Sequence, residues 1–432
     1  MHLRETLWWR IKLNIKIINY LMVILAFVFP ISITAVDVLL PVIILLWFSS
    51  ENLKERLSSV IKEPISLLFV LIAFLTFISA LLSTSWTDSF LAGAHRSLFE
   101  VLAMHYLLLP LLIPVFLTTV EDKFMKYMLV AFVLAMLYSQ LLFYLVYFNF
   151  VDIEYLKSIH LVSSGASSVD PSPFLNRIEY SIFLAVSISF SIHYIIYNKS
   201  HLIRVLLLFF TMLSLLNLFI NGGRTGQLVF VVSFFIYFVA YSRFNHRYLL
   251  MSTLTILLVV TIAYKYSTPF QGKVERAKKD IMLIVENHNY RSSWGARIAS
   301  NMVATAYLTS SSERFIFGAG AGDSEKEYRK YAEENFSQNI YHAVNHLAHT
   351  HNQYLQYWLD GSILAFLLYL LYFYLLVLLD IGFQKPLLYA FASIVIVSTA
   401  TDILMFRTHT ALLFYLITGY FIRYSKKQKQ NI

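Results

Sequence analysis

Apolar runs long enough to cross a lipid bilayer recur along this sequence. Four clear examples are residues 65–82, 205–220, 249–263 and 363–379. About 20 apolar helical residues cross the hydrocarbon core of a bilayer. The chain is 58% hydrophobic and 14% charged, whereas soluble domains are roughly half apolar and a quarter charged. The sequence therefore predicts an all-α polytopic membrane protein.

The basic residues predict how the chain crosses the membrane. Most Lys and Arg of the short connections fall on one side, which the positive-inside rule makes cytoplasmic, together with both termini. The basic N-terminal segment leads into a retained span, because no small-residue cleavage site follows it. The net charge of +9 therefore reflects topology rather than nucleic-acid binding. We count about twelve spans: residues 18–34, 36–49, 65–82, 98–119, 124–149, 177–197, 204–220, 226–241, 248–265, 351–379, 386–405 and 410–424.

These spans divide the chain into three expected parts. Residues 1–265 hold nine transmembrane helices, residues 266–350 form a large extracytoplasmic loop, and residues 351–432 hold three more helices and a cytoplasmic tail. The loop is too long for a plain connection. Helical patterns cover its residues 274–286, 296–307 and 325–335, and the glycines of 318–322 form a turn-rich break. We expect a small helical cap over the membrane domain.

The loop ends in polar residues that lead into the tenth span. Thr350 followed by Gln353 fits a capping box, which makes Thr350 the N-cap and His351 the first helical residue. The positive end of a helix dipole disfavours a protonated imidazole, and a neutral imidazole can accept a proton. His351 is thus a candidate general base at the membrane surface. An interfacial histidine at the start of a helix is the equally plausible alternative.

Cations are scarce in the short extracytoplasmic connections, so each one is a candidate anion ligand. Arg224 follows a glycine turn between two spans, and its planar guanidinium suits phosphate. A snorkelling arginine is the alternative. Arg291 and Arg297, near the start of a candidate helix, could face the same anion or be solvated surface charges. Six more residues near this face could line a polar cavity or be structural: Arg96, Arg177, Glu179, Asp402, Arg407 and His409.

Metal and cysteine chemistry are not expected. The chain has no cysteine, which excludes a thiolate metal site and a Cys nucleophile. His342 and His346 have the spacing of a zinc-protease helix, but alanine stands where the catalytic glutamate is required. The glycines of 318–322 follow no buried strand, so they predict a turn rather than a phosphate-binding loop. We expect neither a bound metal nor a cofactor.

Three elements in order resemble the O-antigen ligase and polymerase superfamily. Gly223-Arg224 is similar to its Ser-Arg-Gly element, and Ser293–Arg297 with 317–320 is similar to its Gly-Arg and Phe-Gly-x-Gly elements. His351-Asn352-Gln353, with Gly361 downstream, is similar to its His-Asn-x motif. The resemblance covers about residues 205–370. Two departures are Gly223 in place of the serine and Ala296 between Gly295 and the arginine.

The resemblance implies a GT-C-type glycosyltransferase with about twelve transmembrane helices and a periplasmic cap, in the inner membrane of a Gram-negative bacterium. A ligase of this family moves a preassembled glycan from undecaprenyl diphosphate to lipid A–core, without metal and with inversion. His351 would be the base, and Arg224 and Arg297 would stabilise the leaving diphosphate. A wider set would bind substrate: Arg291, Arg96, Arg177, Asn352, Gln353, Gly223, Arg407 and His409.

Three other functions fit parts of the sequence. A polymerase of the same superfamily would use the same lipid carrier and another acceptor. A transporter of lipid-linked glycans would also have many spans, although we see no inverted repeat and the candidate residues gather at one face. A non-catalytic assembly subunit would use the cap to dock a partner. The oligomeric state is not predicted by the sequence.

Overall fold

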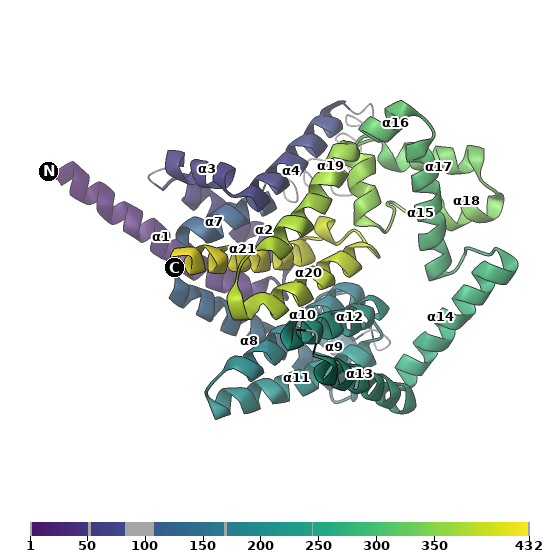
Figure 1. Ribbon diagram of the computed structural model, residues 1–432, viewed down its shortest axis with the longest axis horizontal. Helices are drawn as coiled ribbons and strands as arrows, with labels where there is room; N and C mark the ends of the chain where they lie inside the picture. The colour runs from purple at the N-terminus through teal and green to yellow at the C-terminus, as the bar shows by residue number, and fades with distance from the viewer. Residues whose placement is uncertain (1, 51–52, 83–107, 168–170, 244, 431–432) are drawn as a thin grey trace.

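The computed structural model describes residues 2–50, 53–82, 108–167, 171–243 and 245–430, which form helices and connecting turns without a strand (Figure 1). The helices of the first half are α1 (His2–Val28), α2 (Ile33–Phe48), α3 (Leu53–Lys62), α4 (Pro64–Leu82), η2 (Leu109–Leu111), α7 (Leu112–Thr119), α8 (Asp122–Tyr147), α9 (Ile153–Ser158), α10 (Arg177–Tyr197) and α11 (His201–Asn221). The helices of the second half are α12 (Arg224–Ser242), α13 (His246–Tyr266), α14 (Thr268–Asn287), α15 (Ser293–Thr309), α16 (Ser312–Phe317), α17 (Ser324–Asn335), α18 (Gln338–Val344), α19 (Gln353–Leu378), η3 (Gly382–Gln384), α20 (Lys385–Thr399), η4 (Leu404–Phe406) and α21 (Thr408–Gln430).

Seven helices of the described part are long and apolar enough to cross a membrane: α4, α8, α10, α11, α12, α13 and α19. Counting α2 and α3 as one bent span gives eight. The chain is therefore a helical multi-pass membrane protein by the length and composition of its helices. The expected span at 98–119 lies partly outside the described residues. The total of about twelve spans and the GT-C architecture stay predictions.

Burial separates central helices from peripheral ones. In α10, 72% of the apolar window is buried, whereas in α13 the share is 11%. α10 packs against α11, α12 and α20, and α19 packs along α4. An apolar helix that is buried on every side belongs to the centre of a bundle, and one that is apolar but exposed faces lipid. α10 is therefore a central helix and α13 a peripheral one.

The two ends of the bundle differ. α1 begins and α21 ends at the left of Figure 1, while α15 to α18 lie at the right. Helices α10, α12 and α19 all begin at the end that carries α15 to α18, because contacts join these starts to one another and to the cap. Arg407 contacts Glu179 at the start of α10 and also Asp402, which pairs with His351 just before α19. Gly223, before α12, packs against Ser181 of α10, and Arg297 of α15 bonds to Thr401. The lysine-rich end of α21 lies at the other. This arrangement agrees with the topology expected from the basic residues.

The segment between α13 and α19 folds into five helices. The expected helices at 274–286, 296–307 and 325–335 correspond to α14, α15 and α17. Helices α15, α17 and α18 share a small apolar core that includes Val303, Tyr328 and Val344, and Leu359 of α19 joins it. The cap is thus packed directly onto a membrane helix.

A break in α19 provides the attachment. Ser362 has φ 90° and ψ 167°, which interrupts the helix. The carbonyl of Leu359, one turn earlier, accepts hydrogen bonds from the N–H groups of Ala319 (2.8 Å) and Gly320 (3.0 Å). Gly318 has a left-handed φ of 74°, and a Cβ there would overlap the Trp358 and Leu359 carbonyls. The predicted turn at 318–322 is confirmed, and its role is to hold the cap on α19.

Candidate functional site

His351 lies just before α19, and not in its first turn as expected. The N-cap is Asn352, whose Oδ1 accepts from the N–H groups of Tyr354 (3.0 Å) and Leu355 (3.4 Å). The sequence-based choice of Thr350 as N-cap was wrong, because asparagine at position 352 satisfies these donors directly. His351 itself has φ 51°, a left-handed conformation that is uncommon for residues other than glycine. The local backbone therefore turns the imidazole away from the helix.

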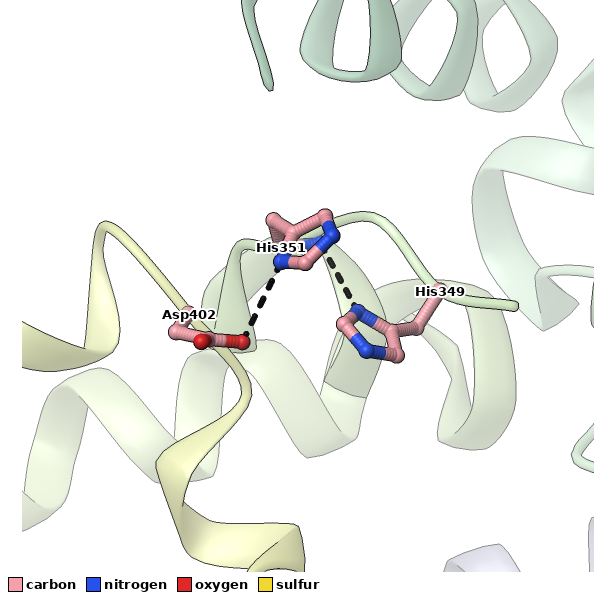
Figure 2. A group of neighbouring side chains, drawn as sticks. All are labelled: His349, His351 and Asp402. Carbon is pink, nitrogen blue, oxygen red and sulfur yellow. Dashed lines mark hydrogen bonds and ion pairs between the residues drawn. The ribbon is translucent and has the colours of Figure 1, made fainter. Parts of the chain in front are cut away.

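The imidazole of His351 is held by a buried carboxylate. Its Nδ1 lies 3.3 Å from Oδ1 of Asp402, which follows α20 (Figure 2). Burial raises the pKa of Asp402, but the hydrogen bond from His351 and the charges of Arg407 and His351 together hold that pKa well below its usual range. An ionised carboxylate can only accept, so Nδ1 carries the proton. Of the two neutral tautomers, this contact selects the one in which Nε2 has the lone pair.

His349 supports the same turn from the other side. Its Nδ1 accepts the backbone N–H of His351 at 3.2 Å, and the two rings meet edge to face with centroids 4.2 Å apart. Burial, and next the charge of His351, lower the pKa of His349 to about 4. A neutral ring keeps the acceptor that this hydrogen bond needs. No role for His349 was predicted from the sequence.

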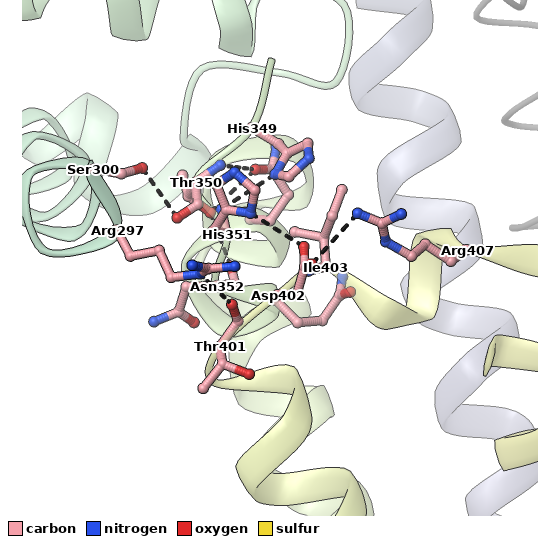
Figure 3. A network of polar contacts seen from close by, with 12 residues as sticks. Arg297, Ser300, His349, Thr350, His351, Asn352, Thr401, Asp402, Ile403 and Arg407 are labelled. Carbon is pink, nitrogen blue, oxygen red and sulfur yellow. Dashed lines mark hydrogen bonds and ion pairs between the residues drawn. The ribbon is translucent and has the colours of Figure 1, made fainter. Parts of the chain in front are cut away.

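Arg407 connects this pair to the central helix. One guanidinium nitrogen lies 3.4 Å from Oδ2 of Asp402, and another lies 3.4 Å from Oε1 of Glu179 on α10. Figure 3 shows Asp402 between Arg407 on one side and His351 on the other. Asp402 is therefore shared by a cation and an imidazole, which fixes both side chains relative to the bundle.

Arg297 reaches the same cluster from the cap. Its Nε donates to the carbonyl of Thr401 (3.1 Å), as Figure 3 shows. Another guanidinium nitrogen donates to Oγ of Ser293 (2.9 Å). Burial lowers the pKa of Arg297. The charge of Asp402 opposes this shift, and the charges of three nearby arginines add to it: Arg224, Arg177 and Arg407. Arg297 thus experiences the positive charge of three other arginines, and such a concentration of guanidinium groups favours an anion nearby.

Arg224 begins α12, and its guanidinium lies 3.5 Å from Oδ2 of Asp280 on α14. Gly223 before it has an ordinary φ of −72° and serves close packing instead. A Cβ on Gly223 would lie 2.5 Å from Cβ of Ser181 and 2.7 Å from the Arg177 carbonyl. The glycine therefore brings the starts of α10 and α12, and with them Arg177 and Arg224, to the same place.

Residues 208–370 match the family model described as O-antigen ligase, Wzy_C. The match contains Arg224, Arg297 and His351, three of the residues just described. The chain carries a domain of the O-antigen ligase and polymerase superfamily. This family is one of membrane glycosyltransferases, in agreement with the multi-pass architecture. A search among curated proteins found no match.

The ligase-family match ends before Asp402 and Arg407, so the structure adds these two groups to the motif residues. Sequence analysis placed both near the correct face but paired neither with His351. The pairing was out of reach because 51 residues separate Asp402 from His351, and only the packing of α20 beside α19 brings them together. Asp280, the partner of Arg224, was also missed, although an acidic residue in an amphipathic helix beside a lone cation was a usable signal.

The remaining predicted substrate contacts differ in position. Gln353 is fully buried, and its side-chain oxygen accepts from the N–H of Met405 (3.0 Å). It therefore supports the backbone around the His351 cluster from within. Arg177 is exposed at the start of α10. Arg291 is also exposed, in the turn before α15. His409 donates through Nδ1 to the carbonyl of Phe29, a contact within the bundle. Arg96 lies outside the described residues.

Thr350 and Gln356 form the scaffold under His351. The N–H and Oγ1 of Thr350 donate to Oε1 of Gln356 (3.0 and 3.2 Å), and the Thr350 carbonyl accepts from Oγ of Ser300 (3.0 Å). The Gln356 amide in turn donates to both carboxylate oxygens of Asp360 (2.9 and 3.0 Å). These bonds tie the turn to α15 of the cap and to α19, so the catalytic candidates rest on two rigid elements.

Three side chains of the site have donor atoms close enough together to be tested as a metal centre. Ligand atoms of His349, His351 and Asp402 lie within 4.8 Å of one another. However, Nδ1 of His349 already accepts a backbone N–H, and Asp402 is paired with Arg407. The surrounding arginines also oppose a second positive charge. The residues therefore fit an anion better than a cation. His342 and His346 are exposed and stand apart from this group in the described chain.

Proposed function

We propose that this protein is an O-antigen ligase. It would transfer a preassembled glycan from undecaprenyl diphosphate to the lipid A–core oligosaccharide during lipopolysaccharide biosynthesis. The observation that carries the proposal is the oriented His351–Asp402 pair beside four arginines at one end of a multi-pass bundle. The superfamily match supports the same reaction class.

His351 would act as the general base. Asp402 accepts a hydrogen bond from the N–H group at Nδ1. Nε2 is then free to accept the proton of the acceptor hydroxyl. The hydroxyl oxygen then attacks the anomeric carbon, and the bond from that carbon to the diphosphate oxygen breaks. The proton ends on Nε2, and the glycan ends on the acceptor. Attack from the face opposite the leaving group inverts the anomeric configuration.

The arginines would stabilise the departing diphosphate. Arg297 is already oriented by the Thr401 carbonyl and Ser293, so it needs little reorganisation. Arg224 is engaged by Asp280 over 3.5 Å, a long contact that a bidentate phosphate would replace. Arg177 and Arg407 add positive charge at a greater distance. We propose a metal-independent transfer on these grounds, since guanidinium groups here provide the charge that a divalent cation would otherwise provide.

The position of the site suits two lipid substrates. The cluster lies where α10, α12 and α19 begin, at the end opposite the lysine-rich terminus of α21. The positive-inside rule assigns the lysine-rich end to the cytoplasm. The proposed site then opens on the periplasmic face of the inner membrane of a Gram-negative cell. There the polar head of each substrate would reach His351 while its hydrocarbon tail stays in the bilayer.

A transfer assay with purified components tests this proposal. Lipid-linked glycan and lipid A–core are mixed with wild-type, His351→Ala or Arg224→Ala protein, and the glycosylated core is quantified. We expect losses of about 10²- to 10⁴-fold for the base variant. Lys126→Ala, an exposed residue of α8 far from the site, serves as the control. Near-normal transfer by both site variants would refute the assignment.

The same assay separates the ligase from its relatives. A polymerase would lengthen the glycan on the lipid carrier and leave the core unmodified. A deletion strain gives the cellular version: loss of a ligase leaves core without O-units, whereas loss of a polymerase leaves core that bears a single unit. Movement of the lipid-linked glycan across the bilayer without transfer would indicate a transporter instead.

A further inference from the structure

A cavity of about 470 Å³ lies at the end of the bundle remote from His351. It is formed where α4 begins and where α19 and α21 end. Its walls include Ile65, Leu375 and Leu378 on the apolar side, and Lys62, Lys426 and Lys429 on the polar side. Neither the family match nor the transfer mechanism assigns a role to this cavity.

The apolar wall continues onto the outer surface of the bundle. Leu375 is partly buried against the core, whereas Leu378, one turn later on α19, is 57% exposed. An exposed leucine at the end of a membrane-spanning helix faces the hydrocarbon of the bilayer. The cavity therefore has an apolar exit in the direction of the lipid chains, which a site for a small soluble anion would not require.

The polar wall has an excess of positive charge. Lys426 lies 2.6 Å from the buried carboxylate of Glu63, so these two charges neutralise each other. Lys62 and Lys429 form no ion pair with any described carboxylate. Asp380, at the end of α19, is the remaining acidic residue of the wall. The cavity thus offers two ammonium groups for an anion and one carboxylate that can accept from hydroxyl groups.

The cavity also lies on the side that attracts anionic lipids. The basic connections assign this end of the bundle to the cytoplasm, and basic pockets between helices on that side hold acidic phospholipid head groups. We propose that the cavity binds an anionic phospholipid of the cytoplasmic leaflet. Its phosphate would lie between Lys62 and Lys429, its glycerol hydroxyls near Asp380, and its acyl chains along Leu375 and Leu378. The lipid would join the ends of α4, α19 and α21.

Native mass spectrometry of the full chain tests this directly. Delipidated protein in non-ionic detergent micelles is titrated with phosphatidylglycerol, and the bound lipid is counted. We expect one saturable site in the wild type, and binding weaker by about 10- to 30-fold in Lys62→Gln/Lys429→Gln. The matched control is Lys126→Gln/Lys199→Gln, which removes two exposed lysines, one on α8 and one in the connection between α10 and α11. That control should keep the affinity within about twofold.

Two further arms distinguish the nature of the ligand. Leu375→Trp, which narrows the apolar wall and keeps every charge, should also weaken binding. Glycerol 3-phosphate should not compete with the lipid, because it lacks acyl chains. Equal losses in the two lysine double variants, equal binding of phosphatidylethanolamine, or competition by glycerol 3-phosphate would each overturn the proposal. Matching thermal transitions of the lipid-free variants establish that they are folded. This inference does not depend on the proposed transfer reaction.

Discussion

Ion pairs occur at both ends of this bundle, but they differ in their surroundings. At the end that carries α15 to α18, Asp402 is inaccessible to solvent and is shared by His351 and Arg407. At the opposite end, where α21 terminates, Asp122 is 45% exposed and contacts Arg423 and Lys427. Exposed ion pairs contribute about 0–1 kcal/mol, whereas a buried carboxylate that loses its partners is costly. Similar residue types are therefore buried and mutually oriented at one end, where we propose a catalytic role, and exposed at the other.

The sharpest test of this contrast replaces each carboxylate by its amide. Asp402→Asn removes the acceptor that orients the imidazole and lets the wrong tautomer form, so transfer should fall by about 10²- to 10⁴-fold. Asp122→Asn should change transfer by less than about threefold. Initial rates of glycosylated core formation measure both. Equal effects at the two ends would remove the distinction between them.

Arginine-to-lysine substitutions at positions 297 and 423 compare the arginines at the two ends of the bundle. Arg297→Lys keeps the charge but loses the planar fork that holds Thr401 and Ser293, so we expect transfer to fall by about 10- to 100-fold. Arg423→Lys, at the end where α21 terminates, should retain transfer within about twofold. A lysine at position 297 that supports full activity would show that charge alone suffices.

Glycine substitutions compare packing at the two ends. Gly223→Ala would place a methyl group 2.5 Å from Cβ of Ser181 and 2.7 Å from a backbone carbonyl, so it should destabilise the protein by about 1–3 kcal/mol. At Gly419→Ala the nearest atoms belong to the Phe116 side chain, at 3.3 Å, and a small movement of that side chain accommodates the methyl group. Thermal unfolding in detergent measures the difference. A Gly223→Ala protein as stable as Gly419→Ala would contradict the tight contact between α10 and α12.

The last comparison concerns a pH dependence of stability. The pKa of His349 is lowered to about 4 from about 6.5 in the unfolded chain. Between these values the unfolded chain binds more protons, so the free energy of unfolding falls as the pH drops from about 6.5 to 4. His349→Asn should flatten this slope. The unfolding midpoint at a series of pH values provides the measurement.

Sequence patterns predicted the long apolar helices and the amphipathic helices of the cap well. Apolar runs placed the long helices, and the amphipathic patterns of 274–286 and 296–307 placed helices in the cap. The motif residues Arg224, Arg297 and His351 fall in the segment that matches the ligase family. Helix starts were less predictable, since Thr350 and Asn352 are both good N-caps and only the packed structure favours Asn352.

Contacts between distant segments were not predictable in the same way. Asp402 bonds to His351 and Asp280 to Arg224 because whole helices pack together, and no local pattern encodes such a pairing. The break at Ser362 was also unexpected, because serine carries no strong helix-breaking signal. These features depend on tertiary structure, and they are the ones that orient the proposed catalytic groups.

The attachment of the cap to α19 has a consequence for how the protein can change. The main-chain N–H groups of Ala319 and Gly320 donate to the Leu359 carbonyl. This attachment therefore depends little on the side chains in the rest of the cap. The outer surfaces of α16 and α17 could then be rebuilt to admit a different sugar polymer while the reactive centre stays in register. A protein engineered to carry a foreign cap should keep Ala319, Gly320 and Leu359, which form this attachment, and exchange the rest of the cap.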